Sequence, residues 1–319
     1  MEERADGGLI SPVTVVAARG RTADLSPTPA LRVAENLWLK LENLQPTGSF
    51  KVRGFLNAVA QLEDTQRESG IVTVSAGNAA LAAAWVARRL GIRCRVVMFE
   101  TAPPPKRLGV EALGAEVLAW PRDEVLAWMA RKGWEDMPEF FIHPFADEAV
   151  MAGHAGLGME LVEQVPGIAR VVVPVGGGGL VVGVTSGLRA AGSEAEVVGA
   201  QSDGYPLWVR TMADGSPPAL TPATIADGTA APYDASMRAR LEAAVQSWLA
   251  VPEEGVRTAV GELARVHKLV VEGGGAIAFA AARILMDEPP AVPIVAVISG
   301  GNIDPALQAQ LIAGPADPG

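Results

Sequence analysis

Hydrophobic positions along the chain fall into short β-branched runs separated by longer stretches with helical periodicity. The short runs predict buried strands at 70–76, 94–100, 170–176, 195–201, 268–274 and 292–300. The Ala- and Leu-rich stretches between them predict helices at 55–62, 79–90, 105–113, 123–131, 150–164 and 276–285. Alternation of continuous apolar strands with helices predicts an α/β fold with open, largely parallel sheets flanked by helices.

Two regions rich in Pro and Gly interrupt this alternation. The segment "DMPEFFIHPFAD" (136–147) is interpreted as a domain junction, and "ADGSPPALTPATIADGTAAPYD" (213–234) as a long ordered loop. A chain of 319 residues is long enough for two domains with sizeable cores.

Composition restricts the classes of partner and compartment. The formal net charge of −10, without a basic block, disfavours binding to nucleic acid or to an anionic membrane. Pro and Gly break the apolar runs before any of them is long enough to span a bilayer, and "MEERADGG" does not resemble a secretory signal. Cys94 is the single cysteine, so no intrachain disulfide can form and a cytoplasmic location is expected.

Candidate chemistry lies in the loops that follow the predicted strands, where α/β sheets place their ligands. In "SAGN" (75–78), Ser75 and Asn78 can simply cap the next helix, or they can hold an anion or a ring hydroxyl together with free N–H groups. Both interpretations stay open on this stretch alone.

A second loop carries four consecutive glycines, Gly176–Gly179, between a strand and an apolar helix. Such a run costs backbone entropy, and it is explained if bare N–H groups approach a phosphate at the helix N-terminus. Leu180 follows where a Walker A loop needs Lys, and Val181 occupies the third glycine position of a Rossmann loop.

A third loop fits a dinucleotide site only loosely. Gly273, Gly275 and Ala278 match the Gly-x-Gly-x-x-Gly/Ala pattern. The next strand, however, ends at Ile298-Ser299 without the acidic residue that holds a ribose, which disfavours a dinucleotide.

One lysine stands out in a chain that contains five lysines and 21 arginines. Lys51 follows a Thr-Gly-Ser turn and Phe50, and Ser299 ends a late strand in "AVISGGN". A lysine, a phosphate-type loop, and Ser and Asn at loop tips match a small phosphorylated cofactor held covalently by an amine. Pyridoxal 5′-phosphate has these requirements. The three histidines have no metal-ligand spacing.

With these motifs in order, the chain resembles the fold-type II pyridoxal-phosphate enzymes (the tryptophan synthase β-like fold), and among them the threonine/serine dehydratase and serine racemase group. The resemblance runs from about Pro27 to Asn302. It is carried by "KLENLQPTGSFKVRG", "SAGN", "HPFADEAVMAGHAGLGMEL", "VPVGGGGL", "TIADG" and "SGGN".

The resemblance implies the residues that would hold the cofactor. Lys51 would bind it covalently and then act as the base at Cα, Phe50 would flank its ring, and Asn78 would bind the phenolic oxygen. The phosphate would be bound by Gly176, Gly177, Gly178, Gly179 and the Leu180 N–H, and Ser299 would face the pyridine nitrogen. A neutral serine at that nitrogen favours β-elimination.

The resemblance also implies a substrate site and an activity. Ser75, Gly77 and Asn78 would receive the amino-acid carboxylate, and Arg122 is aligned with an arginine that helps bind substrate in related racemases. The implied reaction is loss of water from an L-threonine- or L-serine-like β-hydroxy amino acid, which gives a 2-oxo acid and ammonia.

Several positions depart from the family pattern. Ala79 and Leu81 replace a histidine and a glutamine, and Ala76 replaces the second base of the racemases, which argues against racemisation. Gln201 replaces a glutamate that binds an activating cation, so no divalent metal is expected. His154 also differs from the family. These changes lie near the predicted site and leave open which β-hydroxy amino acid is the substrate, including one bulkier or differently charged than threonine.

The resemblance further implies a small domain at 46–145 and a large cofactor-binding domain at 1–45 and 146–319. A homodimer is expected. The alternatives are an amino-acid racemase, a β-replacement synthase, or a non-catalytic homologue that binds the cofactor or an amino acid.

Overall fold

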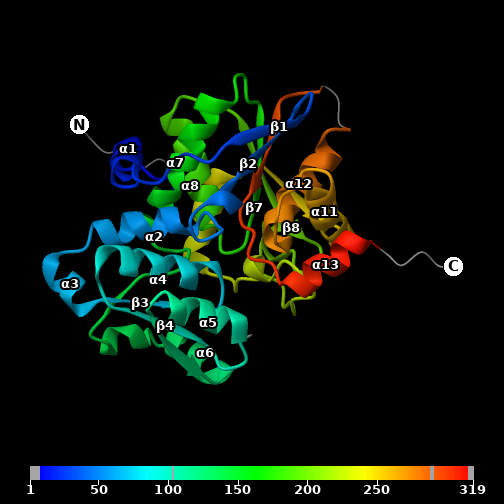
Figure 1. The fold of residues 1–319 in the computed structure, drawn as a ribbon. Helices are drawn as coiled ribbons and strands as arrows, with labels where there is room; N and C mark the ends of the chain where they lie inside the picture. The colour runs from blue at the N-terminus through cyan, green and yellow to red at the C-terminus, as the bar shows by residue number, and fades with distance from the viewer. Residues whose placement is uncertain (1–7, 103, 288–290, 315–319) are drawn as a thin grey trace.

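Two sheets, each flanked by helices, organise the chain (Figure 1). The structure is a computed structural model that describes residues 8–102, 104–287 and 291–314. The larger sheet has the strand order β1-β2-β10-β7-β8-β9 and the smaller one β5-β4-β3-β6.

The strands of the larger sheet come from both ends of the chain. They are β1 (Ala30–Ala34), β2 (Leu37–Leu41), β7 (Arg170–Pro174), β8 (Glu196–Ser202), β9 (Ser247–Val251) and β10 (Ile294–Ile298). Only β1 pairs antiparallel with its neighbour; the other pairs are parallel. β10 is buried at every position, as expected for a parallel strand covered by helices on both faces.

The smaller sheet is contiguous in sequence. It contains β3 (Ile71–Val74), β4 (Cys94–Phe99), β5 (Glu116–Trp120) and the two-residue β6 (Phe140–Phe141), all paired in parallel. β6 lies in the Pro-rich segment that was interpreted as a domain junction.

Helices cover both sheets. They are α1 (Pro12–Arg21), α2 (Lys51–Ala60), α3 (Asp64–Ser69), α4 (Asn78–Leu90), α5 (Pro104–Ala112), α6 (Arg122–Ala130), α7 (Glu148–Gln164), α8 (Gly179–Ala190), α9 (Leu207–Asp214), α10 (Arg238–Ala244), α11 (Glu253–Arg265), α12 (Gly273–Leu285) and α13 (Pro305–Ala313). Short 3₁₀ turns are η1 (Glu42–Leu44), η2 (Gly133–Asp136), η3 (Asp227–Thr229) and η4 (Ala235–Met237).

Helices α7 and α8 pack in unusually close contact. A Cβ on Gly187 would lie 1.9 Å from the Ala155 carbonyl oxygen, and one on Gly158 would lie 2.2 Å from that of Val184. Glycine at these positions therefore lets the two backbones touch beneath the phosphate-type loop, which opens directly into α8.

The predicted α/β fold with largely parallel sheets is confirmed. The predicted strand at 268–274 is wrong. Lys268 has φ +60°, Val270 is 53% exposed, and α12 already begins at Gly273. This apolar run connects two helices, and the edge strand next to β8 is instead β9. In the described part of the chain, no helix has the length and apolar character needed to cross a membrane.

Candidate functional site

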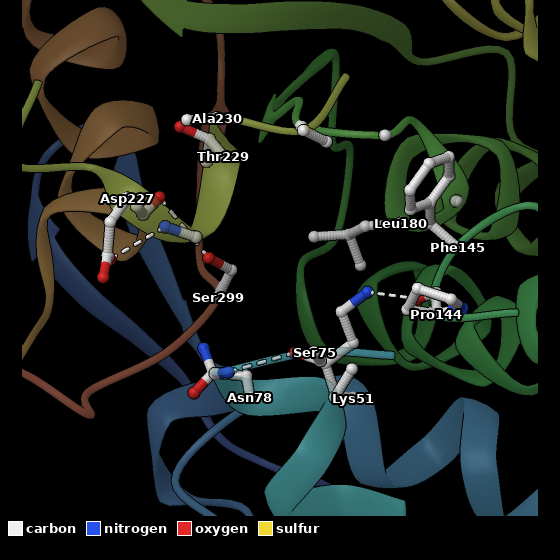
Figure 2. A pocket seen from close by; sticks show the side chains of 18 of the residues that line it. Lys51, Ser75, Asn78, Pro144, Phe145, Leu180, Asp227, Thr229, Ala230 and Ser299 are labelled. Carbon is white, nitrogen blue, oxygen red and sulfur yellow. Dashed lines mark hydrogen bonds between the residues drawn. The ribbon is translucent and has the colours of Figure 1, made fainter. Parts of the chain in front are cut away.

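A cavity of about 370 Å³ opens where the two sheets face each other. It is bordered by the loops that follow β3, β7 and β10, at the carboxyl ends of parallel strands. Figure 2 shows Lys51, Asn78 and Ser299 directed toward the same space, with Leu180 and Phe145 on another side.

The loop before Lys51 is held against the loop after β10 by backbone pairing. The Phe50 N–H donates to the Ser299 carbonyl at 3.1 Å, and the Gly301 N–H donates to the Gly48 carbonyl at 2.9 Å. This short antiparallel contact brings together two motifs that lie some 250 residues apart in sequence. It places Lys51, the first residue of α2, beside Ser299 at the end of β10.

The Lys51 side chain is half-buried, and its amine faces the cavity. Nζ donates to the Pro144 carbonyl at 2.6 Å and lies 5.1 Å from the centre of the Phe50 ring. Burial lowers the pKa of Lys51 to about 8, because an ammonium ion loses its hydration there. A substantial fraction of the amine is therefore neutral near physiological pH, as a nucleophile or base requires.

His143 shapes the turn that carries Pro144. Its Nδ1 accepts the backbone N–H groups of Phe145 at 3.3 Å and Ala146 at 2.9 Å. Burial, and then the charge on Lys51, lower the pKa of His143 to about 4, so the ring is neutral. The imidazole thus fixes the carbonyl that holds Lys51 without adding charge.

The glycine loop leaves no room for side chains. A Cβ on Gly177 would lie 2.2 Å from the Phe145 ring, and one on Gly179 would lie 2.5 Å from the Phe145 carbonyl oxygen. Gly178 has φ +95°, which favours glycine. The loop lines the cavity and leads into the N-terminus of α8, where backbone N–H groups favour an anion.

The "SAGN" loop forms another wall. Ser75 Oγ accepts the Gly77 N–H at 3.0 Å, so Ser75 holds the turn before α4. The first-turn N–H groups of Asn78 and Ala79 lie at the positive end of this helix, beside the cavity. The Asn78 side chain does not cap the helix; it extends to Glu272 and Asn302.

Glu272 is a cavity residue to which no role was assigned from the sequence. Its carboxylate accepts Asn78 Nδ2 at 2.6 Å. Burial, followed by the charge of Asp227, raises its pKa to about 7. The sequence signal that could have identified Glu272 is an isolated acidic residue between an apolar run and three glycines.

One ion pair joins the two sides of the cavity mouth. Lys106 of α5 lies 2.5 Å from a carboxylate oxygen of Asp227 in η3, and both residues line the cavity. Their side chains are 36% and 64% exposed, respectively.

Most of the predicted site residues meet at this cavity, and one does not. Phe50, Lys51, Ser75, Gly77, Asn78, Gly176, Gly177, Gly178, Gly179, Leu180 and Ser299 all line it. Arg122 is absent from the lining; its guanidinium lies 5.1 Å from the Phe99 ring centre.

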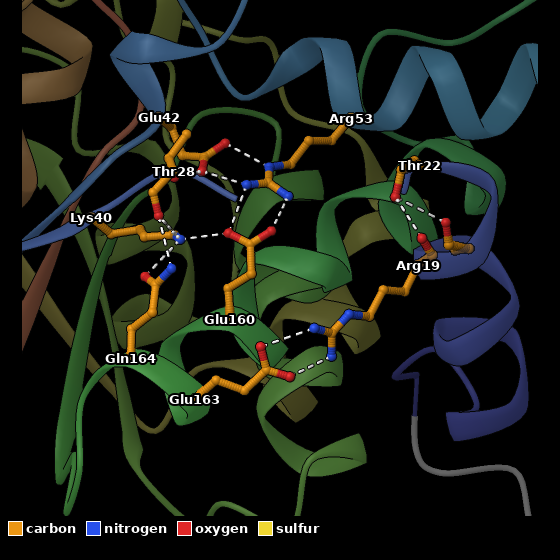
Figure 3. A network of polar contacts seen from close by, with 10 residues as sticks. Arg19, Thr22, Thr28, Lys40, Glu42, Arg53, Glu160, Glu163 and Gln164 are labelled. Atoms are coloured by element: carbon orange, nitrogen blue, oxygen red, sulfur yellow. Dashed lines mark hydrogen bonds and ion pairs between the residues drawn. The ribbon is translucent and has the colours of Figure 1, made fainter. Parts of the chain in front are cut away.

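A buried charge network lies beneath the helix that carries Lys51 (Figure 3). Arg53 binds two carboxylates, with distances of 2.7 and 2.9 Å to Glu42 and 2.6 and 2.9 Å to Glu160. Lys40 donates to Glu160 at 2.5 Å. Burial alone would raise the pKa of Glu42, but the nearby Arg53 guanidinium lowers it by more than that. The pKa of Glu42 therefore lies below its ordinary value, and the carboxyl stays ionised. The network fixes α2 onto β2 and α7.

Gln201 has a structural role. Nε2 donates to the Val175 carbonyl at 2.9 Å, and Oε1 accepts the backbone N–H groups of Trp208 at 2.7 Å and Val209 at 3.0 Å. Both ends of the amide are thus occupied by backbone.

Comparison with known proteins identifies relatives along nearly the whole chain. Residues 21–300 match the family described as "Pyridoxal-phosphate dependent enzyme". The chain is 37% identical to the L-threonine ammonia-lyase of Thermotoga maritima over 272 residues, which is 84% of this chain and 67% of that protein. It is 34% identical to the catabolic L-threonine dehydratase of Staphylococcus aureus, covering 84% and 80%.

Solved structures give the same picture of the fold. Maize serine racemase is similar with a TM-score of 0.88 at 28% identity, covering 96% of this chain and 97% of that one. The serine racemase of Dictyostelium discoideum has a TM-score of 0.84 at 28% identity, covering 92% and 99%. A solved threonine deaminase has a TM-score of 0.83 at 34% identity, also covering 92% and 99%.

Proposed function

We propose that this chain, which belongs to the family of pyridoxal-phosphate-dependent enzymes, is a lyase that removes water from β-hydroxy amino acids such as L-threonine and L-serine. The products are a 2-oxo acid and ammonia. The observation that carries the proposal is a half-buried amine with a lowered pKa, Lys51, in one cavity with a tetraglycine loop and a neutral serine. The relatives named as threonine ammonia-lyase and dehydratase support it.

The residues present fit pyridoxal phosphate. In the tetraglycine loop, a Cβ at any of the four positions would press on a neighbouring residue, and the bare backbone offers donors to a phosphate at the start of α8. Lys51 supplies the amine for covalent attachment, and Ser299, which is 5% exposed, brings its hydroxyl to the end of β10. The bound cofactor supplies an electron sink for the pair of electrons left at Cα.

Lys51 is the group that moves the proton. Once the substrate's amino group has displaced Lys51 from the cofactor, the freed amine, positioned by the Pro144 carbonyl, would accept the Cα proton. With its pKa lowered to about 8, a fraction of this amine is neutral near physiological pH and can act as the base.

The substrate carboxylate is assigned to the start of α4. The N–H groups of Asn78 and Ala79 and the helix dipole favour a negative charge there. Ser75 and Gly77 support the loop through their mutual hydrogen bond. Ala76, which also lines the cavity, has no ionisable group, and this favours elimination over racemisation.

The decisive experiment assays a panel of β-hydroxy amino acids for release of 2-oxo acid and ammonia. We expect turnover by the wild-type holoenzyme and none by Lys51→Ala, which also loses the absorbance of the covalently attached cofactor. A chiral assay measures racemisation, and an added thiol measures β-replacement. Cofactor binding without any of these reactions would indicate the non-catalytic alternative.

We also propose a homodimer in the cytoplasm, with a small domain at 46–145 and a large domain at 1–45 and 146–319. Helix α1 supports an interface, because Val13 and Val16 are 76% and 59% exposed on a helix otherwise packed against α7. Sedimentation of wild type and a Val13→Glu, Val16→Glu double variant tests the dimer.

A further inference from the structure

Three side chains form a hydrogen-bond chain whose direction is fixed at one end. Asn302 Nδ2 donates to the Thr47 carbonyl at 2.9 Å, and a carbonyl can only accept. The same Nδ2 donates to Asn78 Oδ1 at 2.7 Å, which leaves Asn78 Nδ2 facing Glu272 at 2.6 Å. The chain therefore ends on Glu272 Oε1 as an acceptor.

The Glu272 side chain points away from its own helix, α12, and bonds to Asn78 instead. It occupies the N-cap position of α12, where an acidic side chain ordinarily accepts first-turn N–H groups, yet it makes no such bond. Its carboxylate instead reaches across to Asn78, at the start of α4. Glu272 thus bonds to Asn78 in the cavity instead of capping the N-terminus of α12.

The glycine in "SGGN" makes this arrangement possible. A Cβ on Gly300 would lie 2.5 Å from Glu272 Oε1 and 3.1 Å from Asn78 Nδ2. Any side chain at position 300 would therefore separate the carboxylate from the amide, which explains the glycine beside Ser299.

We propose that Glu272 is a positioning residue of the cofactor site: it holds the Asn78 amide toward the cavity, and its proton makes cofactor retention depend on pH. Asn78 Nδ2 has two N–H bonds, and Glu272 takes one. The second is available to the cofactor's ring oxygen in the cavity that Asn78 lines. This inference depends on the cofactor and not on the proposed reaction.

The charge on Glu272 acts on the same ligand. Burial, then the Asp227 carboxylate, raise the pKa of Glu272 to about 7, whereas the hydrogen bonds from Asn78 and the Asn302 backbone and the charge of Lys106 oppose the rise. Above this pH, a carboxylate lies beside a site for an anionic cofactor. We expect wild-type affinity to fall as the pH rises, because protonated Glu272 keeps the hydrogen bond without the charge.

The test measures cofactor dissociation constants for the wild type and Glu272→Gln at about pH 6 and about pH 8.5. Gln keeps an acceptor for Asn78 and is always neutral. We expect the two proteins to agree within about twofold at the lower pH, and the wild type to be weaker by about five- to tenfold at the higher pH. Glu272→Ala, which has neither the acceptor nor the charge, should bind about tenfold more weakly than Glu272→Gln at both pH values.

Second-site variants make the test sharper. Asp227→Asn should move the wild-type transition to lower pH and Lys106→Met to higher pH, whereas Glu111→Gln, on the solvent side of α5, should change nothing. Parallel pH profiles for wild type and Glu272→Gln, or an affinity of Glu272→Ala equal to that of Glu272→Gln, would overturn the proposal.

If Glu272→Gln binds the cofactor poorly, the pH dependence of folding stability of the cofactor-free protein tests the same proposal. The folded state holds a proton on Glu272 that the unfolded state releases above its ordinary pKa of 4.5. Wild-type stability should therefore fall, relative to Glu272→Gln, between about pH 5 and about pH 8. Equal slopes would contradict the proposal. A cofactor-binding protein that shows these effects but forms no 2-oxo acid would refute only the lyase assignment.

Discussion

At the scale of single residues, burial sets the chemistry of the site. Lys51 has its pKa lowered by loss of hydration, not by a neighbouring cation, and the His143 ring beside it stays neutral for the same reason. Glu272 is shifted in the opposite direction by the same effect. Burial thus shifts both groups toward their uncharged forms, in which the amine can attack and the carboxyl can coexist with an anionic ligand.

Covalent loading of the cofactor should report the state of Lys51. The neutral amine is the reactive form, so the loading rate should rise about tenfold per pH unit below about pH 8 and level off above it. Absorbance after mixing cofactor-free protein with cofactor measures the rate. The Glu272→Gln background removes the other titration expected in this range.

Lys51→Arg provides the control for this measurement, because its guanidinium keeps a positive charge and cannot form the covalent link. A loading rate that keeps rising to about pH 10 would show that the amine has its ordinary pKa.

At the scale of elements, α2 is fixed from below by charges rather than by apolar packing alone. Arg53, two residues after Lys51, is 2% exposed and holds two carboxylates that belong to η1 and α7. Such networks cost desolvation energy when they form, but removing one partner leaves unpaired buried charges. The orientation of the lysine at the start of α2 therefore depends on an ion network outside the cavity.

Two arginine–carboxylate pairs in the same region allow a matched comparison. Arg53→Met should lower the free energy of unfolding by about 3–5 kcal/mol, because Glu42 and Glu160 lose their buried partner. Arg19→Met removes an equally short pair with Glu163, but those side chains are 38% and 54% exposed, so the cost should stay below about 1 kcal/mol. Equilibrium unfolding in urea measures both. Equal losses would contradict the distinction.

At the scale of the whole molecule, the sequence motifs identified residues that meet at one cavity, whereas the predicted strands matched the two sheets less well. Lys51, the glycine loop and Ser299 were found because each follows a strand or turn with unusual chemistry. The short strands β1 and β2 were missed because they carry no long apolar run, and the run at 268–272 is not a strand because Lys268 turns the chain. Glu272 was missed because its role depends on Asn78, about 190 residues away.

The ion pair between Lys106 and Asp227 connects α5, beside the small sheet, with η3, beside the large one. Its exposure limits its contribution to stability to about 1 kcal/mol, but both of its residues line the cavity, so breaking it should alter the surroundings of a bound substrate. We expect Lys106→Met to change the free energy of unfolding little and to raise the KM for the amino acid about two- to fivefold at low salt.

High salt should raise the KM of the wild type, as Lys106→Met does, because salt weakens the same ion pair between Lys106 and Asp227. Screening by about 0.5 M salt weakens an exposed ion pair, so wild-type KM should rise with salt toward that of Lys106→Met. The variant should respond little, because it has no pair left to screen. Arg238→Met, which removes the exposed pair with Glu242 within α10, should keep the wild-type response. Additive effects of salt and of Lys106→Met would show that the pair does not control the mouth, since two ways of breaking one contact cannot add.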